Sequence, residues 1–178
     1  MKRIILIALL VLSFASPASA VSDAYILLGA SNAAHPEIAA SFEAATGVDV
    51  IVCARGKTGV DYWLSSLPYK RCVNSAKGYN VIGVLFVNGE QEAKAGGDWL
   101  ALTVKLTNKF NVTFGKTLPV YHVRAHEDFP GIYLQTVRAA QWASGWCVVD
   151  VDDLTLDSSW HYSPASDTVI GQRLADCR

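Results

Sequence analysis

A serine, a histidine and several aspartates stand where they could carry out acyl transfer. Ser31 follows the apolar stretch "AYILL", within the run Gly29-Ala30-Ser31-Asn32. His161 lies between two aromatic residues in "DDLTLDSSWHYSP", and Asp157 lies four residues before it. A serine hydroxyl becomes a strong nucleophile when a neutral histidine accepts its proton, and a carboxylate can orient that histidine. These residue types predict nucleophilic catalysis by Ser31, His161 and Asp157.

Two loops between Ser31 and His161 could stabilise the oxyanion of such a reaction. In "ARGKTGVDYW", Gly56 and Gly59 allow the backbone to turn tightly and to direct an N–H inward. In "VNGEQEA", Asn88 could donate from its side-chain amide, and Glu90 follows closely. Each feature also has a structural interpretation. Glycines form turns, Ser31 could cap a helix, and a histidine between aromatic residues can be a packing residue.

The remaining histidines and the cysteines offer weaker chemistry. His35 is expected in a first helical turn, and a metal pair at His122 and His126 is conceivable. The cysteines show no CxxC spacing, which disfavours zinc, and no phosphate-binding or dinucleotide loop is present. We therefore expect no metal and no organic cofactor.

The elements that must position these residues alternate along the chain. Five short apolar runs predict buried strands at Ala24–Leu28, Val48–Cys53, Val81–Val87, Leu118–Val123 and Trp146–Val151. Helical segments are predicted at Pro36–Ala45, Asp98–Phe110, Gly131–Ala143 and Ser166–Ala175. This alternation predicts a parallel, doubly wound α/β sheet. In the common strand order 2-1-3-4-5, the loops that carry Gly56 and Asn88 flank Ser31 at the carboxyl ends of the strands.

The ends and the charge of the chain indicate its compartment. Residues 1–20 have a basic start, an apolar run and a closing Ala-Ser-Ala, as in a secretory signal peptide. Cleavage there leaves 158 residues, 21–178, enough for one domain. The apolar run is too short to span a bilayer, so we expect a soluble protein that is secreted or periplasmic. Without Lys2 and Arg3, 13 basic residues face 16 acidic ones, and nucleic acid is not an expected partner.

An even number of cysteines in an exported chain predicts disulfides. The four cysteines allow three pairings. We predict Cys53 with Cys72 and Cys147 with Cys177, because each of these bridges closes a local loop.

Four blocks of the sequence, in order, resemble the sialate O-acetylesterase-like branch of the SGNH hydrolases, which includes bacterial acetylxylan esterases. The blocks are "ILLGASN", "GKTGVDYW", "FVNGEQEA" and "WHYSPAS...IGQRLA". The resemblance spans nearly the whole mature chain. It implies a three-layer α/β/α, flavodoxin-like fold with a five-stranded parallel sheet. It also implies Ser31 as nucleophile and His161 as base, with the Ser31 N–H, Gly56 and Asn88 as oxyanion donors.

The sequence departs from the usual blocks of this family at four positions. Ala30 stands where the family has Gln, Lys57 replaces the second glycine of the second block, and Asn88 replaces a glutamine. The position three residues before His161 is Ser158, whereas the family has Asp there. Asp157 is the nearest carboxylate and could reach the imidazole if the loop bulges. The alternative is a serine–histidine dyad in which a backbone carbonyl or a water orients His161.

The predicted function is an exported serine esterase that removes acetyl or other small acyl groups from carbohydrate. Glu90, Trp63, Trp160 and Tyr162 are candidate substrate-binding residues, the aromatic ones through stacking on sugar rings, although core packing explains these three equally well. One alternative is an esterase or thioesterase for another small acyl ester. Another is an inactive carbohydrate-binding module of the same fold. The sequence does not indicate the acyl group, the sugar or the oligomeric state.

Overall fold

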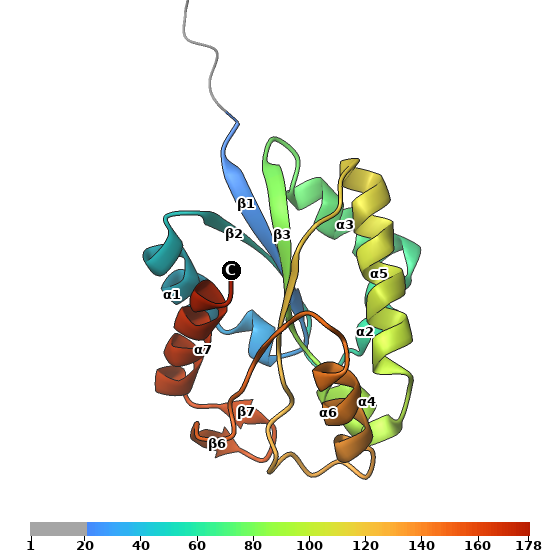
Figure 1. Cartoon of the computed structure of the whole chain (residues 1–178), viewed down its shortest axis with the longest axis vertical. Helices are drawn as coiled ribbons and strands as arrows, with labels where there is room; N and C mark the ends of the chain where they lie inside the picture. The colour runs from blue at the N-terminus through green and yellow to red at the C-terminus, as the bar shows by residue number, and fades with distance from the viewer. Residues whose placement is uncertain (1–20) are drawn as a thin grey trace, which may run out of the picture.

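The protein is built around a five-stranded parallel sheet with the strand order β2-β1-β3-β4-β5, as predicted. The computed structural model describes residues 21–178, so the expected signal peptide lies outside the described residues. The strands are β1 (Asp23–Gly29), β2 (Asp49–Ala54), β3 (Asn80–Val87), β4 (Val120–Val123) and β5 (Cys147–Val149). All run in one direction, toward the lower end of the molecule in Figure 1.

Helices cover both faces of the sheet and form the outer layers. On one side, α1 (Pro36–Thr46) packs against α7 (Pro164–Asp176). The other side carries α2 (Val60–Leu64), α3 (Ser66–Ser75), α4 (Glu90–Ala95), α5 (Trp99–Phe114) and α6 (Leu134–Trp142) (Figure 1). The result is the predicted three-layer α/β/α sandwich. Within residues 21–178, no helix combines the length and apolar character needed to cross a membrane.

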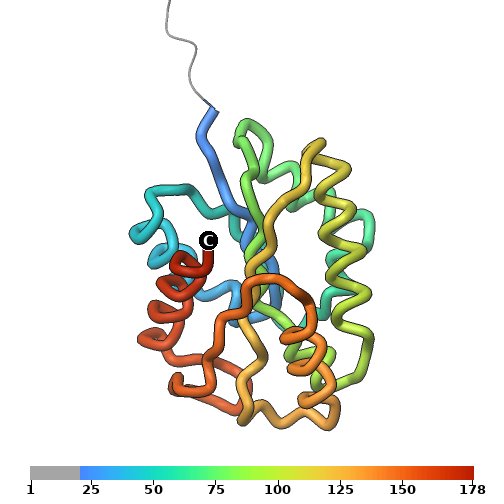
Figure 2. The backbone as a smooth tube through the Cα atoms, in the orientation of Figure 1, coloured from blue at the N-terminus to red at the C-terminus, as the bar shows by residue number. Residues whose placement is uncertain are grey.

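Three short helices and a hairpin were not predicted. The helices α2 and α4 have only five and six residues, too few to show a helical period, and α3 is polar on average. The hairpin consists of β6 (Leu156–Ser158) and β7 (His161–Tyr162), and it interrupts the long segment between β5 and α7. Figure 2 follows this segment from β5 past the lower end of the molecule to α7. These unpredicted pieces all lie in or beside the loops that leave the carboxyl ends of the strands.

Burial differs between the central and the edge strands. β1 and β3 are buried almost throughout, because helices cover both of their faces. β2 lies at an edge of the sheet and alternates instead, with Val52 46% exposed between two buried neighbours. The central strands therefore hold the core and give the loops at their ends a rigid base.

A glycine allows the two helices of one layer to approach closely. A Cβ at Gly171 of α7 would overlap the Ile38 carbonyl oxygen of α1. Ser41 also donates to the Thr168 carbonyl oxygen across this contact, at 2.8 Å. Because α1 begins just after Ser31 and α7 just after His161, this packing couples the two segments that carry the candidate catalytic residues.

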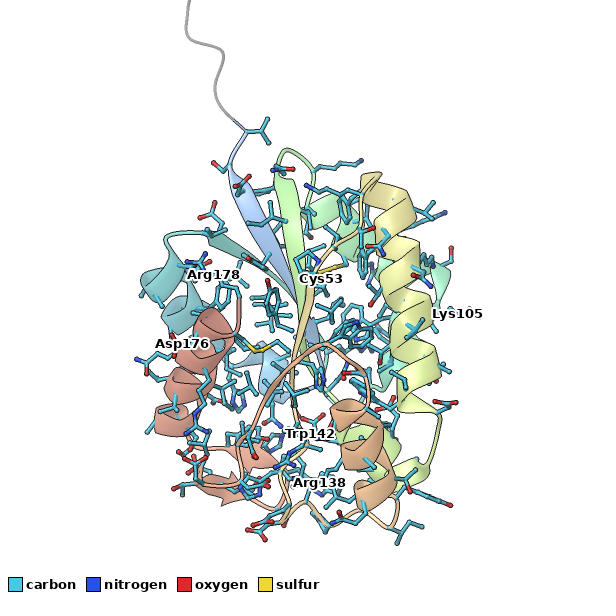
Figure 3. All side chains as sticks on the ribbon, in the orientation of Figure 1. Cys53, Lys105, Arg138, Trp142, Asp176 and Arg178 are labelled. Carbon is cyan, nitrogen blue, oxygen red and sulfur yellow. A yellow bond between two sulfur atoms is a disulfide. The ribbon has the colours of Figure 1, made fainter. Side chains whose placement is uncertain are left out.

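Both disulfides follow the predicted pairing (Figure 3). Cys53 of β2 joins Cys72 of α3, with 5.6 Å between Cα atoms. Cys147 of β5 joins Cys177 just after α7, with 5.9 Å between Cα atoms. The bridges thus tie one helix to each edge strand of the sheet.

We predict that peptide mapping of unreduced protein recovers these two linkages. The double substitution Cys147→Ser and Cys177→Ser should lower the free energy of unfolding by about 3 kcal/mol in urea titrations, because it opens a loop of about 30 residues in the unfolded chain. The predicted catalytic residues should be unaffected at 25 °C, because this bridge lies away from the loops at the carboxyl ends of the strands. Cross-paired peptides or four free thiols would contradict the pairing.

Candidate active site

The structure brings Ser31 and His161 into direct contact, although 130 positions separate them in the sequence. Their Oγ and Nε2 atoms are 2.8 Å apart. Ser31 is the N-cap residue of a short 3₁₀ helix (Asn32–Ala34), but its side chain makes no capping hydrogen bond. The capping interpretation therefore does not account for the Ser31 hydroxyl. A serine hydroxyl within reach of a histidine nitrogen is the arrangement that proton transfer from serine requires.

The end of β1 fixes the place of Ser31. A Cβ at Gly29 would overlap the carbonyl oxygen of Val87, so only glycine allows β1 to end this close to β3. The next residue donates its N–H to the same oxygen, at 3.3 Å from Ala30 N to Val87 O. Ser31 thus leaves the sheet directly beside the loop that follows β3.

The hairpin orients His161 through Ser158, and the predicted role of Asp157 is wrong in this respect. Ser158 Oγ lies 3.0 Å from His161 Nδ1. Ser158 and His161 are cross-strand partners and therefore project to the same face of the hairpin. Asp157 lies at an irregularity in register, between the Leu156–Tyr162 and Ser158–His161 pairs, and it is exposed. Although the strand is irregular here, the Asp157 carboxylate makes no hydrogen bond to the imidazole within residues 21–178.

The other aspartates of this segment are also engaged away from His161. Asp152 accepts from Arg124 and Arg138, and these two guanidinium groups help to lower its pKa. Asp153 accepts two hydrogen bonds from Arg173, which lower its pKa to about 2. These ion pairs fasten the segment to α6 and α7. Among residues 21–178, no carboxylate makes a hydrogen bond to His161.

Asn32, a residue that the sequence analysis did not single out, joins three parts of the site. Its buried amide donates from Nδ2 to Glu90 Oε1 at 2.6 Å and to the Trp160 carbonyl oxygen at 3.0 Å. Its Oδ1 accepts from the Tyr162 N–H at 3.4 Å. Asn32 therefore holds the backbone on both sides of His161. Its position directly after Ser31, at the end of the first block, was the available sequence signal.

Burial changes the ionisation of Glu90. Desolvation raises the pKa of this carboxyl to about 7, although hydrogen bonds from its own backbone and from Asn32 oppose the shift. Its Oε2 atom is buried and has no hydrogen-bond partner within residues 21–178. Glu90 lines the cleft at Ser31, where its carboxyl can exist in either ionisation state near neutral pH.

Asn88 presents an unpaired donor near Ser31. Its Oδ1 accepts from Trp99 Nε1 at 2.8 Å, which leaves Nδ2 buried and without a partner in the described part of the chain. Gln141 donates to the Asn88 carbonyl oxygen at 3.1 Å and so holds the backbone of this loop. The amide therefore keeps one N–H that no acceptor within residues 21–178 uses. Trp99 and Gln141 carried no sequence signal for this role.

The second loop places Gly56 against Ser31. A Cβ built on Gly56 would lie 3.8 Å from the Ser31 Cβ. The next residue, Lys57, has φ = 63°, the left-handed conformation that glycine adopts easily. Lys57, which stands where the resembling family has a glycine, therefore adopts a conformation that favours glycine. Buried Glu92 fixes the end of this loop by accepting from the Val60 N–H at 2.7 Å.

An open cleft of about 440 Å³ lies over these groups. Trp160 and Glu90, two of the four predicted substrate-binding residues, line it, together with Ala30, Ser31, Lys57, Thr58, Gln91, Lys94 and His161. Trp63 and Tyr162 do not line it. Trp63 is 6% exposed and faces another hollow beside the Cys53–Cys72 bridge, and Tyr162 is 2% exposed and packs on Phe129. Their predicted role in stacking on sugar is wrong, because both rings are core side chains.

The two histidines considered for a metal are buried and hydrogen-bonded. His122 Nε2 lies 3.1 Å from the Gln141 carbonyl oxygen, and desolvation lowers its pKa to about 4. His126 Nε2 lies 3.1 Å from the Leu154 carbonyl oxygen. Within residues 21–178, no group of three or more His, Cys, Asp or Glu side chains is arranged to hold a metal ion.

Several solved structures share this fold. A protein described as an SGNH hydrolase from Slackia heliotrinireducens superposes with a TM-score of 0.67 at 14% identity, over 88% of this chain and 98% of that one. A lipase/acylhydrolase from Enterococcus faecalis gives a TM-score of 0.60 at 13% identity, over 86% and 94% of the two chains. The psychrotrophic esterase EstA from Pseudoalteromonas sp., in a structure inhibited by monoethylphosphonate, gives 0.59 at 12% identity, over 86% and 95%. At these identities the likeness establishes the SGNH hydrolase fold.

Family membership rests on a separate comparison. No curated protein matches the chain. The family model described as "Carbohydrate esterase, sialic acid-specific acetylesterase" matches residues 33–177, which is most of the chain and begins two residues after Ser31. The chain therefore belongs to this carbohydrate esterase family, known as SASA, whose members are ester hydrolases.

Proposed function

We propose that the protein is an exported serine esterase that removes acetyl or other small acyl groups from carbohydrate. The observation that carries this proposal is the 2.8 Å contact between Ser31 Oγ and His161 Nε2 at the floor of an open cleft. Family membership supports ester hydrolysis as the reaction. The two disulfides support an oxidising compartment and thus the predicted cleavage of residues 1–20.

The reaction proceeds through an acyl-enzyme. Ser31 Oγ attacks the ester carbonyl carbon while its proton passes to His161 Nε2. The tetrahedral intermediate then collapses, the C–O bond to the sugar breaks, and His161 returns the proton to the leaving alcohol. A water molecule repeats these steps on the acyl-enzyme, which releases the carboxylic acid and restores Ser31.

Three donors would stabilise the negative charge on the carbonyl oxygen. They are the N–H groups of Ser31 and Gly56 and the side-chain amide of Asn88. The free Nδ2 atom of Asn88 and the contact between Gly56 and Ser31 support this assignment. Trp99 acts as a positioning residue. Its indole N–H donates to Asn88 Oδ1, so the amide nitrogen of Asn88 points away from the Trp99 ring. Such preorganised donors are usually the largest contribution to this type of catalysis.

His161 works as part of a serine–histidine dyad in which Ser158 takes the place of the family's aspartate. The neutral His161 ring that this role requires carries its proton on Nδ1. The Nδ1–H group donates a hydrogen bond to Ser158 Oγ, and Nε2 is free to accept the proton of Ser31. A hydroxyl orients the ring but carries no negative charge. The imidazolium that forms during the reaction is therefore stabilised less by Ser158 than by a carboxylate.

The substrate assignment rests on the family and on the cleft. Trp160 presents a ring at the cleft for stacking on a sugar, and Lys57 and Lys94 add positive charge at its rim. A small acyl ester of another alcohol would fit the same catalytic groups. An inactive binding module is less consistent with the site, because binding alone does not require a serine–histidine contact beside an unpaired buried amide.

We predict that Ser31→Ala abolishes the hydrolysis of an aryl acetate by the purified protein. Turnover should fall by roughly 10⁴-fold or more, because the nucleophile is lost, while circular dichroism stays unchanged. A serine-directed phosphonate should label Ser31, as mass spectrometry can show. Ser65→Ala, which alters an exposed serine far from the cleft, is the matched control. Labelling of another residue, or undiminished turnover in Ser31→Ala, would refute the proposed nucleophile.

We predict that Asp157→Asn keeps near-normal turnover, whereas Ser158→Ala lowers it by roughly fivefold, because one neutral hydrogen bond to the imidazole is lost. Ser158→Asp should have a different signature. A carboxylate beside Nδ1 favours the protonated imidazole, so the acid limb of the kcat/KM profile should move to higher pH. A large loss in Asp157→Asn with an unaffected Ser158→Ala would restore Asp157 as the orienting group.

A further inference from the structure

A second histidine is hydrogen-bonded to a buried carboxyl group close to the proposed base. His35 Nδ1 lies 2.6 Å from Asp167 Oδ2. The Asp167 side chain is only 1% exposed, whereas that of His35 is 32% exposed. The other carboxylate oxygen, Oδ1, is buried and has no hydrogen-bond partner within residues 21–178. A buried carboxylate held by one imidazole is costly to desolvate, so its presence beside a reaction site calls for an explanation.

The pair lies next to His161. The ring centroids of His35 and His161 are 5.9 Å apart, with the rings inclined by 41°. Both histidines and Asp167 line one hollow of about 480 Å³, which is separate from the cleft over Ser31, and Ser158, Asp157 and Glu37 line it as well. The hollow therefore opens on the Nδ1 side of His161, where a triad aspartate would approach.

Both members of the pair are attached to the catalytic segments. His35 is the N-cap residue of α1, and its N–H donates to the Asn32 carbonyl oxygen at 3.1 Å. Asp167 lies in the first turns of α7, whose N-cap Ser163 follows His161 by two residues. The close packing of α1 on α7 at Gly171 makes this arrangement rigid.

We propose that His35 and Asp167 form a positioning pair that supplies His161 with the negative charge that Ser158 lacks. This inference rests on the proposed function of Ser31 and His161. When Asp167 is ionised and His35 is neutral, the pair carries one negative charge behind the base. This charge stabilises the His161 imidazolium through space, in place of a direct carboxylate contact.

The charges around the pair set the pH range in which it works. Desolvation raises the pKa of Asp167 to about 6, the hydrogen bond from His35 opposes the shift, and Glu37 and Asp157 add to it. The other titratable groups that line the hollow are His161 and Tyr162. Burial raises the pKa of the Tyr162 phenol well above its ordinary value, so this phenol stays neutral. The pair is a coupled system that gains a proton as the pH falls through this range. Its negative charge is therefore present at neutral pH and is lost in mild acid.

The test is Asp167→Asn, which keeps the shape of the side chain and removes the charge. NMR titration of the imidazole signals should show the pKa of His161 lowered by about 0.5 to 1 unit, because a nearby negative charge is gone. In aryl acetate hydrolysis, kcat should fall by roughly three- to tenfold, which is the same free energy as a pKa shift of about 0.5 to 1 unit. The acid limb of the kcat/KM profile should move to lower pH by about 0.5 to 1 unit as well. KM should stay near its original value.

Two further variants separate charge from packing. Glu37→Gln removes a negative charge from the same hollow without touching the pair, and it should move the His161 pKa by less than half as much as Asp167→Asn. Ser158→Asp added to Asp167→Asn returns a carboxylate to the base, and it should restore both the His161 pKa and kcat. An equal shift in Glu37→Gln would mean that any charge in the hollow suffices, which would overturn the assignment to the pair.

The outcomes distinguish this inference from the proposed function. The NMR titration reads the pKa of His161 whether or not the protein hydrolyses the ester, and an unchanged value in Asp167→Asn overturns the inference, whatever happens to thermal stability. An inactive Ser31→Ala together with an unchanged His161 pKa in Asp167→Asn would leave the esterase proposal standing and refute only the pair. Full activity of Ser31→Ala would refute the esterase proposal, while a lowered His161 pKa would still establish the electrostatic coupling.

Discussion

The site depends on one buried amide, that of Asn32. Its three hydrogen bonds reach Glu90, the carbonyl oxygen of Trp160 and the N–H of Tyr162. The hairpin that carries His161 has only two short strands and could not hold its position by itself. Because the amide is buried and every one of its bonds would be costly to lose, it fixes the backbone around His161 relative to Ser31.

The electrostatics of the site reflect carboxyl groups that are buried rather than solvated. Glu90 on one side of His161 has a pKa near 7, and Asp167 on the other has one near 6, in both cases mainly through desolvation. The direct hydrogen-bond partner of His161 Nδ1 is the neutral hydroxyl group of Ser158. Glu90 and Asp167 make no hydrogen bond to the His161 ring within residues 21–178, and their ionisation changes with pH near neutrality. A triad with a strongly acidic aspartate would be less sensitive in this range.

Three departures from the family pattern lie in or beside the site. Lys57 stands in place of a glycine and adopts a left-handed conformation, at a cost of roughly 1 kcal/mol, and it places a positive charge at the cleft. Asn88 replaces a glutamine, and Trp99 holds its shorter side chain in place. At Ser158 the hydrogen bond to the imidazole is preserved, but the charge is not. The site thus combines hydrogen bonds that hold Asn88 and His161 in place with a neutral partner at the imidazole.

The sequence alone predicted the parallel sheet, its longer helices and the meeting of Ser31 with His161, because apolar runs mark the strands and parallel topology brings their loops to one edge of the sheet. It also favoured the observed disulfide pairing among three, because these two bridges close local loops. The tertiary structure alone decided which groups surround the base. The hairpin places Ser158 rather than Asp157 at His161 Nδ1, and the packing of α1 on α7 introduces His35 and Asp167 from distant segments. Such contacts depend on side-chain direction and helix packing to within about an ångström, and spacing along a chain does not encode these quantities.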